Sequence, residues 1–399
     1  MSEVDYYEQV RRNLVLGPIN APKHKSITKL MKVFWNEEEI KILSHFGKVG
    51  IWTSPKELEE KTGIPKDEIK QILARSVKIG TQAKKSARYS LIPLLPGIFE
   101  KYYIIRKDTE ENQKEAAKHY RDMMKKVGPA GAYESKDKVF RPLLPYEAKD
   151  KLIEINESLD VKSQALPYEL VKQLIDDNED FAVIPCQCRL IGELTGEPCD
   201  CAPAAMGCFL VGMAAQMVPN MCDDARILTK EEAIQFLKDT EKAGLVHNTT
   251  FGSEESGVFI CNCCSCHCGA LYPARLIHVK GAHTSNYAPK INMDLCVKCE
   301  TCMKKCPSEA IYHKWPIKPD SSDEKMVIKE ELCIGCGICA VNCPKDAIKM
   351  VKVRDVVPKK APKLGDVSFA ELLALKILKK HIIHLVFFIF YSVFQLKKE

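Results

Sequence analysis

The distribution of cysteine constrains this chain more than any other feature. The 399 residues include 19 cysteines, all of which lie between Cys186 and Cys343. An odd number in a long chain argues against a disulfide framework, whereas thiols two or three residues apart are typical of metal ligation in a reducing compartment. The N-terminal residues include acids and lack an apolar core, so they do not predict a signal peptide. We therefore expect a cytoplasmic protein organised around metal sites.

Length and composition predict an α+β protein of several domains. A chain of 399 residues is long enough for two to four domains, and its 46% hydrophobic and 28% charged residues fit a globular protein. The net charge of +6 is mild and does not by itself indicate nucleic acid as a partner. The expected parts are a helical module over 26–127, a cysteine-rich module over 146–285, a second cysteine-rich domain over 286–353 and an apolar helical tail over 367–396.

A cysteine motif occurs twice near the C-terminal end. CVKCETCMKKCP begins at Cys296 and CIGCGICAVNCP at Cys333, and both read C-x2-C-x2-C-x3-C-P. The flanks DLC…CPSEAI and ELC…CPKDAI repeat as well, which indicates an internal duplication. The second loop contains Gly335 and Gly337, which allow the backbone to approach a bound group closely. In the first loop we expect Glu300 and Thr301 in place of these glycines.

This doubled motif resembles the bacterial-type ferredoxins that carry two [4Fe–4S] clusters. The resemblance implies a ferredoxin-like domain that transfers single electrons, in which the fourth cysteine of each run binds the other cluster. Zinc and disulfides are the alternatives, but zinc does not require a doubled four-cysteine run. The implied ligands are Cys296, Cys299, Cys302 and Cys343 for the first cluster, and Cys333, Cys336, Cys339 and Cys306 for the second.

The two cysteine loops differ in charge. The first contains Lys298, Lys304 and Lys305, whereas the second is apolar and rich in glycine. Because nearby positive charge stabilises the more negative, reduced form of a cluster, we expect the first cluster to have the higher reduction potential.

The middle module alternates apolar strands with dense cysteine runs. A strand over Phe181–Ile184 precedes a loop with Cys186 and Cys188, and a second strand, 257–260, leads into CNCCSCHC. We expect a helix over 202–218 that contains Cys208. Thr229 and Glu232 form a capping box for the next helix, which ends at Gly244.

These runs indicate one shared metal site or two adjacent ones. The alternatives are one or two further iron–sulfur clusters, structural zinc, and redox-active free thiols. Cys201 and Cys222 are weaker candidates, and Cys222 fits an ordinary buried thiol. The candidate ligands are Cys186, Cys188, Cys199, Cys208, Cys261, Cys263, Cys264, Cys266 and Cys268.

The middle module also resembles part of larger iron–sulfur proteins of anaerobes. In those proteins C-x-C-R…C-D…C and C-N-C-C-x-C segments precede a terminal ferredoxin, as they do here. His267 stands where the resemblance implies another cysteine. Arg189 is compatible with balancing cluster charge or with a surface ion pair, and we expect the ion pair.

The N-terminal module resembles a winged-helix domain. Ser54-Pro55-x-Glu57 is a capping box, Thr62–Pro65 form a turn, and a helix over 65–80 is followed by a basic stretch. The resemblance implies DNA contact or, alternatively, a protein-binding or structural role. Because acidic residues dilute the positive field, we do not expect nucleic acid as a partner. The candidate DNA contacts are Lys70, Arg75, Lys78, Lys84, Lys85 and Arg88.

The tail contains a run of 15 almost continuously apolar residues, Ile382–Leu396. This is shorter than the ~20 residues that span a bilayer. Membrane association through 367–396 and a helix docked on protein remain alternatives.

The function expected from these features is electron transfer. The chain has no GxGxxG or P-loop motif and no convincing catalytic triad or carboxylate pair. We expect a carrier or oxidoreductase subunit that exchanges electrons with a partner flavoprotein or membrane oxidoreductase. A redox-responsive regulator that binds DNA and a reductase with an open cluster site are the alternatives.

Overall fold

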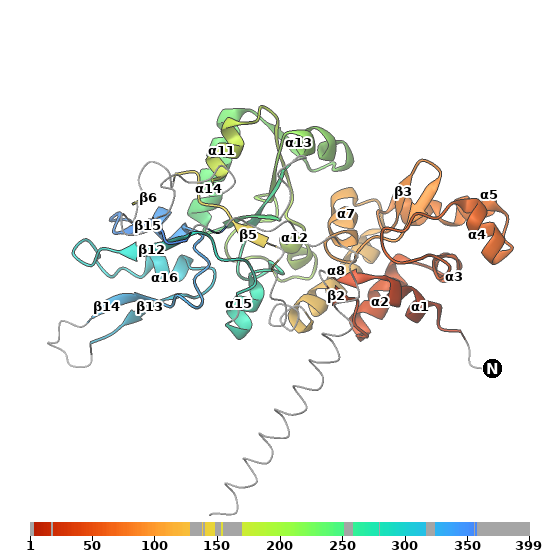
Figure 1. Ribbon diagram of the computed structural model, residues 1–399, viewed down its shortest axis with the longest axis horizontal. Helices are drawn as coiled ribbons and strands as arrows, with labels where there is room; N and C mark the ends of the chain where they lie inside the picture. Colours follow the sequence, from red (N-terminus) through yellow and green to blue (C-terminus); the bar gives the residue numbers. More distant parts are fainter. Residues whose placement is uncertain are drawn as a thin grey trace, which may run out of the picture. The chain divides into compact units, whose positions relative to one another are not determined.

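The computed structural model describes residues 4–16, 19–127, 138, 140–147, 153–154, 170–250, 258–278, 280–316, 324–354 and 356 (Figure 1). They divide into two compact units between Phe99 and Glu100. The apolar tail over 367–396 lies outside the described residues. Within the described ranges, no helix has both the length and the apolarity needed to cross a membrane.

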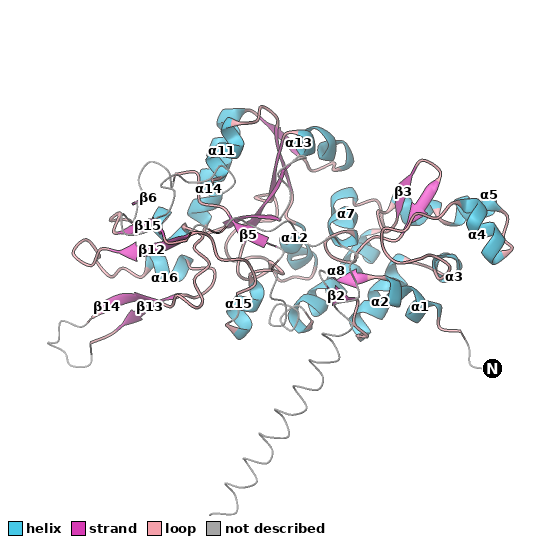
Figure 2. Cartoon of the chain, viewed as in Figure 1, coloured by secondary structure: helices cyan, strands magenta, loops and turns pink. Residues whose placement is uncertain are grey.

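The first unit is mainly helical (Figure 2). Two small antiparallel hairpins, β1–β2 and β3–β4, accompany its helices. Its elements are α1 (Tyr6–Asn13), β1 (Val15–Leu16), β2 (Ile19–Asn20), α2 (Lys25–Phe34), α3 (Glu37–Leu43), α4 (Pro55–Thr62), α5 (Lys66–Ile72), α6 (Ala74–Lys78), β3 (Ala83–Lys85) and β4 (Arg88–Ser90).

Local sequence signals set the ends of these helices. The predicted capping box of α4 is confirmed, because Ser54 Oγ accepts a hydrogen bond from the Glu57 amide and the Glu57 carboxylate accepts one from the Ser54 amide. The helix ends at Gly63 with a φ of 73°. The segment predicted as one helix over 65–80 forms two, α5 and α6, which meet at Leu73. The hairpin that follows has the position of a wing, and the winged-helix assignment stays a prediction.

The second unit is built on a six-stranded antiparallel sheet. The strand order is β5-β10-β11-β8-β7-β9. The strands are β5 (Phe140–Pro142), β7 (Phe181–Ile184), β8 (Cys208–Val211), β9 (Arg226–Leu228), β10 (Val246–Thr250) and β11 (Val258–Cys263). The helices around it are α8 (Glu110–Lys126), α11 (Val171–Asp176), α12 (Gln187–Leu194), α13 (Met213–Met217), the 3-10 helix η2 (Val218–Met221), α14 (Lys230–Ala243) and α15 (Tyr272–Ile277), while α7 (Ile98–Ile105) crosses the boundary between the units.

Three aromatic rings pack the core between this sheet and α14. Phe209 stacks on Phe181 at a centroid distance of 6.0 Å and on Phe236 at 6.1 Å. The same apolar cluster includes Val171 and Ile175 of α11. The predicted capping box of α14 is confirmed, and the helix ends at Gly244 as expected.

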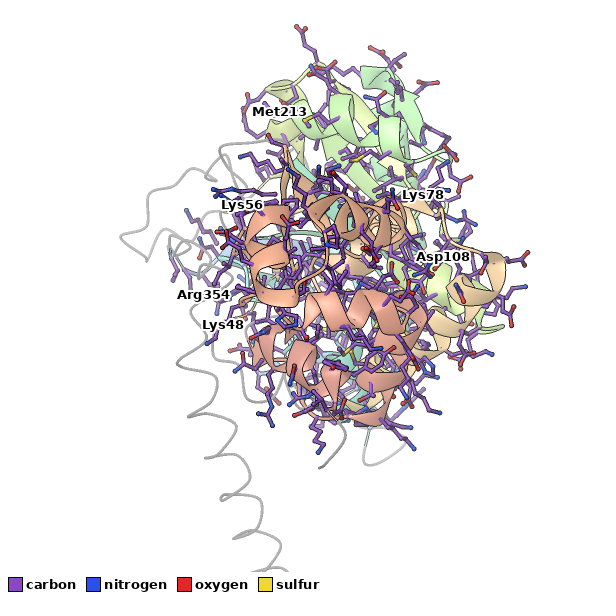
Figure 3. The ribbon with its side chains drawn as sticks, turned by 90° about the vertical axis from the view of Figure 1, so that its right-hand side faces the viewer. Lys48, Lys56, Lys78, Asp108, Met213 and Arg354 are labelled. Atoms are coloured by element: carbon purple, nitrogen blue, oxygen red, sulfur yellow. The ribbon has the colours of Figure 1, made fainter. Side chains whose placement is uncertain are left out.

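Two predictions for the middle module are wrong. The segment predicted as a helix over 202–218 instead contains strand β8, which begins at Cys208, and the short helix α13, which begins at the exposed Met213 (Figure 3). All four residues of β8 are buried, so the strand lacks the polar alternation that would distinguish it from a buried helix. Cys188 lies within α12 rather than on a loop, and Cys186 is the residue that precedes this helix.

A small mixed sheet of three strands and a separate hairpin follow in the second unit. Strands β12 (Tyr287–Ile291) and β15 (Ile348–Lys352) pair antiparallel, and β6 (Ile153–Glu154) joins β15 in parallel. A hairpin of β13 (Ile311–Lys314) and β14 (Lys325–Ile328) lies between the two cysteine motifs in the sequence. Each motif contains one short helix, α16 (Thr301–Lys305) or α17 (Ile338–Val341), which reflects the internal duplication.

We expect Phe209→Ala to destabilise the second unit by about 3–5 kcal/mol, because it removes the central ring of the stack and leaves a cavity. Chemical denaturation followed by tryptophan fluorescence and circular dichroism measures the loss. Phe259→Ala in the neighbouring β11 is the matched control, since Phe259 is 37% exposed and should cost less. Equal losses for the two variants would contradict the proposed packing role of Phe209.

Candidate metal centres

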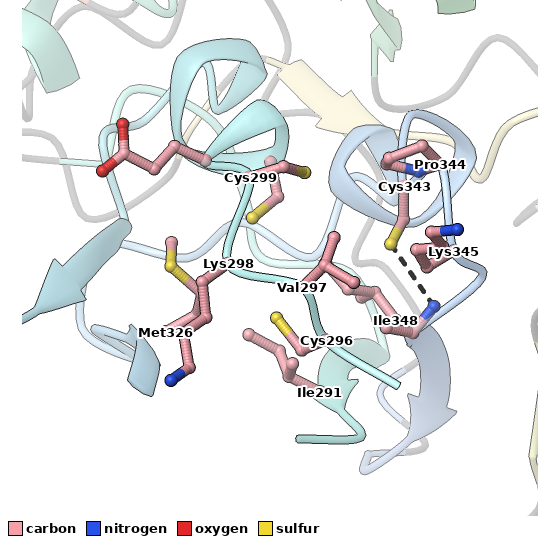
Figure 4. A pocket seen from close by; sticks show the side chains of 13 residues that line it. Ile291, Cys296, Val297, Lys298, Cys299, Met326, Cys343, Pro344, Lys345 and Ile348 are labelled. Atoms are coloured by element: carbon pink, nitrogen blue, oxygen red, sulfur yellow. Dashed lines mark hydrogen bonds between the residues drawn. The ribbon is translucent and has the colours of Figure 1, made fainter. Parts of the chain in front are cut away.

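The first four cysteines predicted as ligands lie around one cavity. Cys296, Cys299, Cys302 and Cys343 line this cavity (Figure 4). Apolar side chains, among them Ile291, complete the wall. Three of the cysteines come from the first motif and the fourth from the second.

The other four predicted ligands lie around a second cavity. Its cysteines are Cys306, Cys333, Cys336 and Cys339. The two cavities are related by the duplication, because the fourth cysteine accepts an equivalent amide hydrogen bond in each half. Cys306 Sγ accepts from Ala310 at 3.2 Å, and Cys343 Sγ accepts from Ala347 at 3.3 Å (dashed in Figure 4).

The backbone of the two cysteine loops is the same, although the residues differ. Gly335 and Gly337 have φ values of 69° and 77°, and Lys298 and Glu300 have 57° and 60° at the corresponding positions. The residues in place of the glycines are therefore Lys298 and Glu300, and the expected pair of Glu300 and Thr301 is wrong.

Packing explains why only the second loop requires glycine. A Cβ atom on Gly335 would lie 2.2 Å from the carbonyl oxygen of Tyr287, and one on Gly337 would lie 2.7 Å from Pro145 Cδ. The second loop is thus covered by neighbouring chain.

The first centre lies closer to solvent than the second. Cys299 is exposed, whereas Cys336 and Cys339 are buried. Hydrogen bonds from Thr301 hold the pKa of Cys299 below its usual value. Burial raises the pKa of Cys302 to about 11, and burial also raises the pKa of Cys339.

An ion-pair network accompanies the first loop. Lys298 Nζ lies 3.0 Å from Glu324 Oε2, and the ring of His313 bridges Glu300 at 2.9 Å and Glu324 at 2.8 Å. The positive charge of Lys298 is therefore shared with a carboxylate.

Six thiols of the middle module form a second kind of constellation, which we name the six-thiol group. Strands β8 and β11, the start of α12 and the loop after β11 bring them together. Hydrogen-bonding contacts with Cys188 and Cys208 lower the pKa of Cys186, and contacts with Cys261 and Cys268 lower that of Cys263. The members are Cys186, Cys188, Cys208, Cys261, Cys263 and Cys268.

Four other residues form a compact ligand set beside this group. Their potential ligand atoms all lie within 4.8 Å of one another, and Cys199 Sγ and Cys266 Sγ are 3.3 Å apart. The set includes His267, whose role the sequence left in doubt. The exposed Cys201 lies next to it, and its contact with Cys199 raises the pKa of Cys201 to about 11. The members are Cys199, Cys264, Cys266 and His267.

Arg189 is buried, so the expected surface ion pair is wrong. Its side chain is completely inaccessible to solvent. The guanidinium donates to the carbonyl oxygens of Pro203 at 3.2 Å and Asn262 at 2.8 Å, and also to that of Met206. The sequence could not reveal this environment, because the three carbonyl acceptors come from residues that are distant from Arg189 in the chain.

The guanidinium of Arg189 lies between the two groups of thiols. Burial acts to lower its pKa, but the charges of Cys186, Cys264 and Cys199 outweigh burial and raise it. Arg189 is therefore a buried cation that interacts with the charges of both cysteine groups. Cys222 belongs to neither group and is buried among apolar residues such as Ala214 and Val218, as expected of an ordinary thiol.

A polar network that the sequence did not reveal fixes the cysteine-bearing end of β11. His247 Nε2 lies 3.0 Å from Glu241 Oε1, and Nδ1 lies 2.7 Å from Asn262 Oδ1. Asn262 also donates to the carbonyl of Gly207 at 2.7 Å. Because Asn262 separates Cys261 from Cys263, the network sets the direction of both thiols. The only signal in the sequence is the presence of polar residues within apolar strands.

Comparison with known proteins supports the C-terminal part of this description. Residues 295–347 match the family model of the 4Fe-4S dicluster domain. A comparison with curated proteins found no match. The matched segment contains both cavities' cysteines, and the thiols and amide donors around them fit iron–sulfur clusters. The C-terminal region of this chain is therefore an iron–sulfur, ferredoxin-like region.

Proposed function

We propose that this protein transfers single electrons through two [4Fe–4S] clusters, held by the two sets of four cysteines that line the cavities. The observation that carries the proposal is the division of eight cysteines into two cavities, each with three ligands from one motif and one from the other. The clusters, when bound, supply one-electron redox chemistry. The protein supplies thiolates, amide donors to the fourth cysteines and burial that differs between the two sites.

The arrangement of the cysteines suggests a direction for the relay. Cys263 and Cys268 of the six-thiol group share one apolar cluster with Cys336 of the second centre. At the first centre Cys299 is exposed, and the nearby Leu295 and Val297 are 52% and 57% exposed. We propose that electrons enter at the middle module and leave at the first centre. A redox partner such as a flavoprotein or a membrane oxidoreductase would dock there.

The six-thiol group is the proposed site of a further iron–sulfur cluster. Four thiolates suffice for a [4Fe–4S] cluster, so six provide more ligands than one cluster requires. A reductase would use an open cluster site that lacks a protein ligand. The surplus of thiols does not support such a site. None of the 19 cysteines is paired in a disulfide, which suits a cytoplasmic, reducing compartment.

We expect the anaerobically purified protein to contain about twelve irons per chain, four for each of three clusters. Cys302→Ser and Cys336→Ser should each remove about four, because each takes one ligand from a different cavity. Colorimetric iron determination and EPR measure the content. Cys222→Ser is the control and should leave the iron unchanged. Iron below about eight in the unaltered protein would defeat the proposed function.

The first centre should have the higher reduction potential. Lys298 pairs with Glu324, so the charge difference on which the sequence prediction rested is reduced. Exposure near Cys299 still favours the more highly charged reduced state, because water solvates it. Redox titration monitored by EPR orders the two centres, and Cys302→Ser identifies the signal of the first. Equal potentials, or the reverse order, would contradict the prediction.

The regulator alternative predicts DNA binding by the first unit, and the basic side chains argue against it. Arg75 bonds Glu39 at 3.0 Å and the carbonyl of Phe34 at 2.9 Å, and Lys70 pairs with Asp67 at 2.7 Å. We expect the full-length protein not to retard a DNA duplex at low salt. A complex that weakens steeply as salt rises would instead support the regulator.

A further inference from the structure

We propose that Cys199, Cys264, Cys266 and His267 bind a single zinc ion, separate from the electron-transfer centres. The ion would hold the loop after α12 against the segment that follows β11. This site is distinct from the six-thiol group and from both cavities of the ferredoxin-like region.

The spacing of the ligand atoms fits one ion. Tetrahedral zinc with Zn–S bonds of ≈ 2.3 Å places its sulfur ligands about 3.8 Å apart. The four potential ligand atoms all lie within 4.8 Å of one another, with Cys199 Sγ and Cys266 Sγ at 3.3 Å. A [4Fe–4S] cluster spreads its ligands more widely, because each thiolate binds a different iron at a separate corner. Three cysteines and one histidine are a frequent ligand set of structural zinc.

The hydrogen bond of His267 leaves the nitrogen that a metal needs. Its Nε2 lies 2.8 Å from the backbone oxygen of Glu197. A carbonyl can only accept, so Nε2 carries a proton, and in the neutral ring, the form that binds a metal, Nδ1 presents a lone pair. Nδ1 is buried and has no hydrogen-bond partner within the described part of the chain. Metal-ligating histidines commonly donate their other N–H to a carbonyl in this way.

The surrounding charge also suits a zinc–thiolate site. Three thiolates and one Zn²⁺ carry a net negative charge of one. The buried guanidinium of Arg189 faces Cys199 and Cys264, and it donates hydrogen bonds to the carbonyl oxygens of Pro203, Asn262 and Met206. The anionic site therefore supplies a counter-charge for a cation that burial alone would destabilise.

Neighbouring contacts indicate a structural clasp. Glu197 forms ion pairs with Arg121 at 3.0 Å and Lys125 at 2.8 Å, and Arg121 donates to the carbonyl of Cys266 at 3.3 Å. The ligand set thus joins the loop after α12, the segment after β11 and helix α8. Four protein ligands leave no open coordination position, which is typical of structural rather than catalytic zinc.

The test is to measure zinc and iron in anaerobically purified full-length protein by mass spectrometry. We expect about one zinc per chain. Cys264→Ser and His267→Ala should lose the zinc while the EPR signals of the ferredoxin-like region remain, and Cys222→Ser should keep both. His267→Cys should retain zinc, because four thiolates also form a tetrahedral site. Replacing zinc by Co²⁺ should then shift the absorption spectrum of this variant from that of three sulfurs and one nitrogen to that of four sulfurs.

Two results would overturn the proposal. One is zinc that stays bound in both Cys264→Ser and His267→Ala. The other is little zinc in the unaltered protein together with a loss of iron in Cys264→Ser, which would assign these residues to a cluster. The His267→Cys variant separates loss of a ligand from loss of folding. Neither result bears on the eight cysteines of the two cavities, whose iron is measured independently.

Discussion

The C-terminal end of α14 holds the cysteine-bearing parts of the second unit together. The carbonyl groups in the last turn of a helix lack partners within the helix. Lys305 donates to those of Lys242 and Ala243 at 3.0 and 3.3 Å, and Asn342 donates to that of Glu241 at 2.9 Å. Lys305 and Asn342 directly precede Cys306 and Cys343. Each of these two cysteines lines the cavity whose other three cysteines come from the other motif. The ammonium group of Lys305 also suits the negative end of the helix.

The same helix end reaches the middle module through the side chain of Glu241. Its carboxylate contacts His247, and His247 contacts Asn262 between two cysteines of β11. One turn of helix therefore fixes backbone in both regions that carry thiols. This coupling explains why the second unit is compact as a whole, although the family match covers only residues 295–347.

Local signals in the sequence predicted the parts that depend on local interactions. The capping boxes of α4 and α14 are of this kind, and the repeated cysteine motif marks the segment that matches the dicluster family model. Prediction from the sequence failed where a segment is buried on all sides. The apolar run of β8 fits a strand or a helix equally well, and it was predicted as a helix. Prediction also failed for Arg189, because its partners are backbone carbonyls that come close only in the folded chain.

The exposure of Cys299 has a consequence for the protein in air. The two halves arose as copies of one motif, yet the second loop is covered by Tyr287 and Pro145 while the first is open to water. A surface that admits a partner also admits dioxygen. Oxidative damage should therefore begin on the side of Cys299, and the proposed exit for electrons would set the lifetime of the whole relay outside an anaerobic environment.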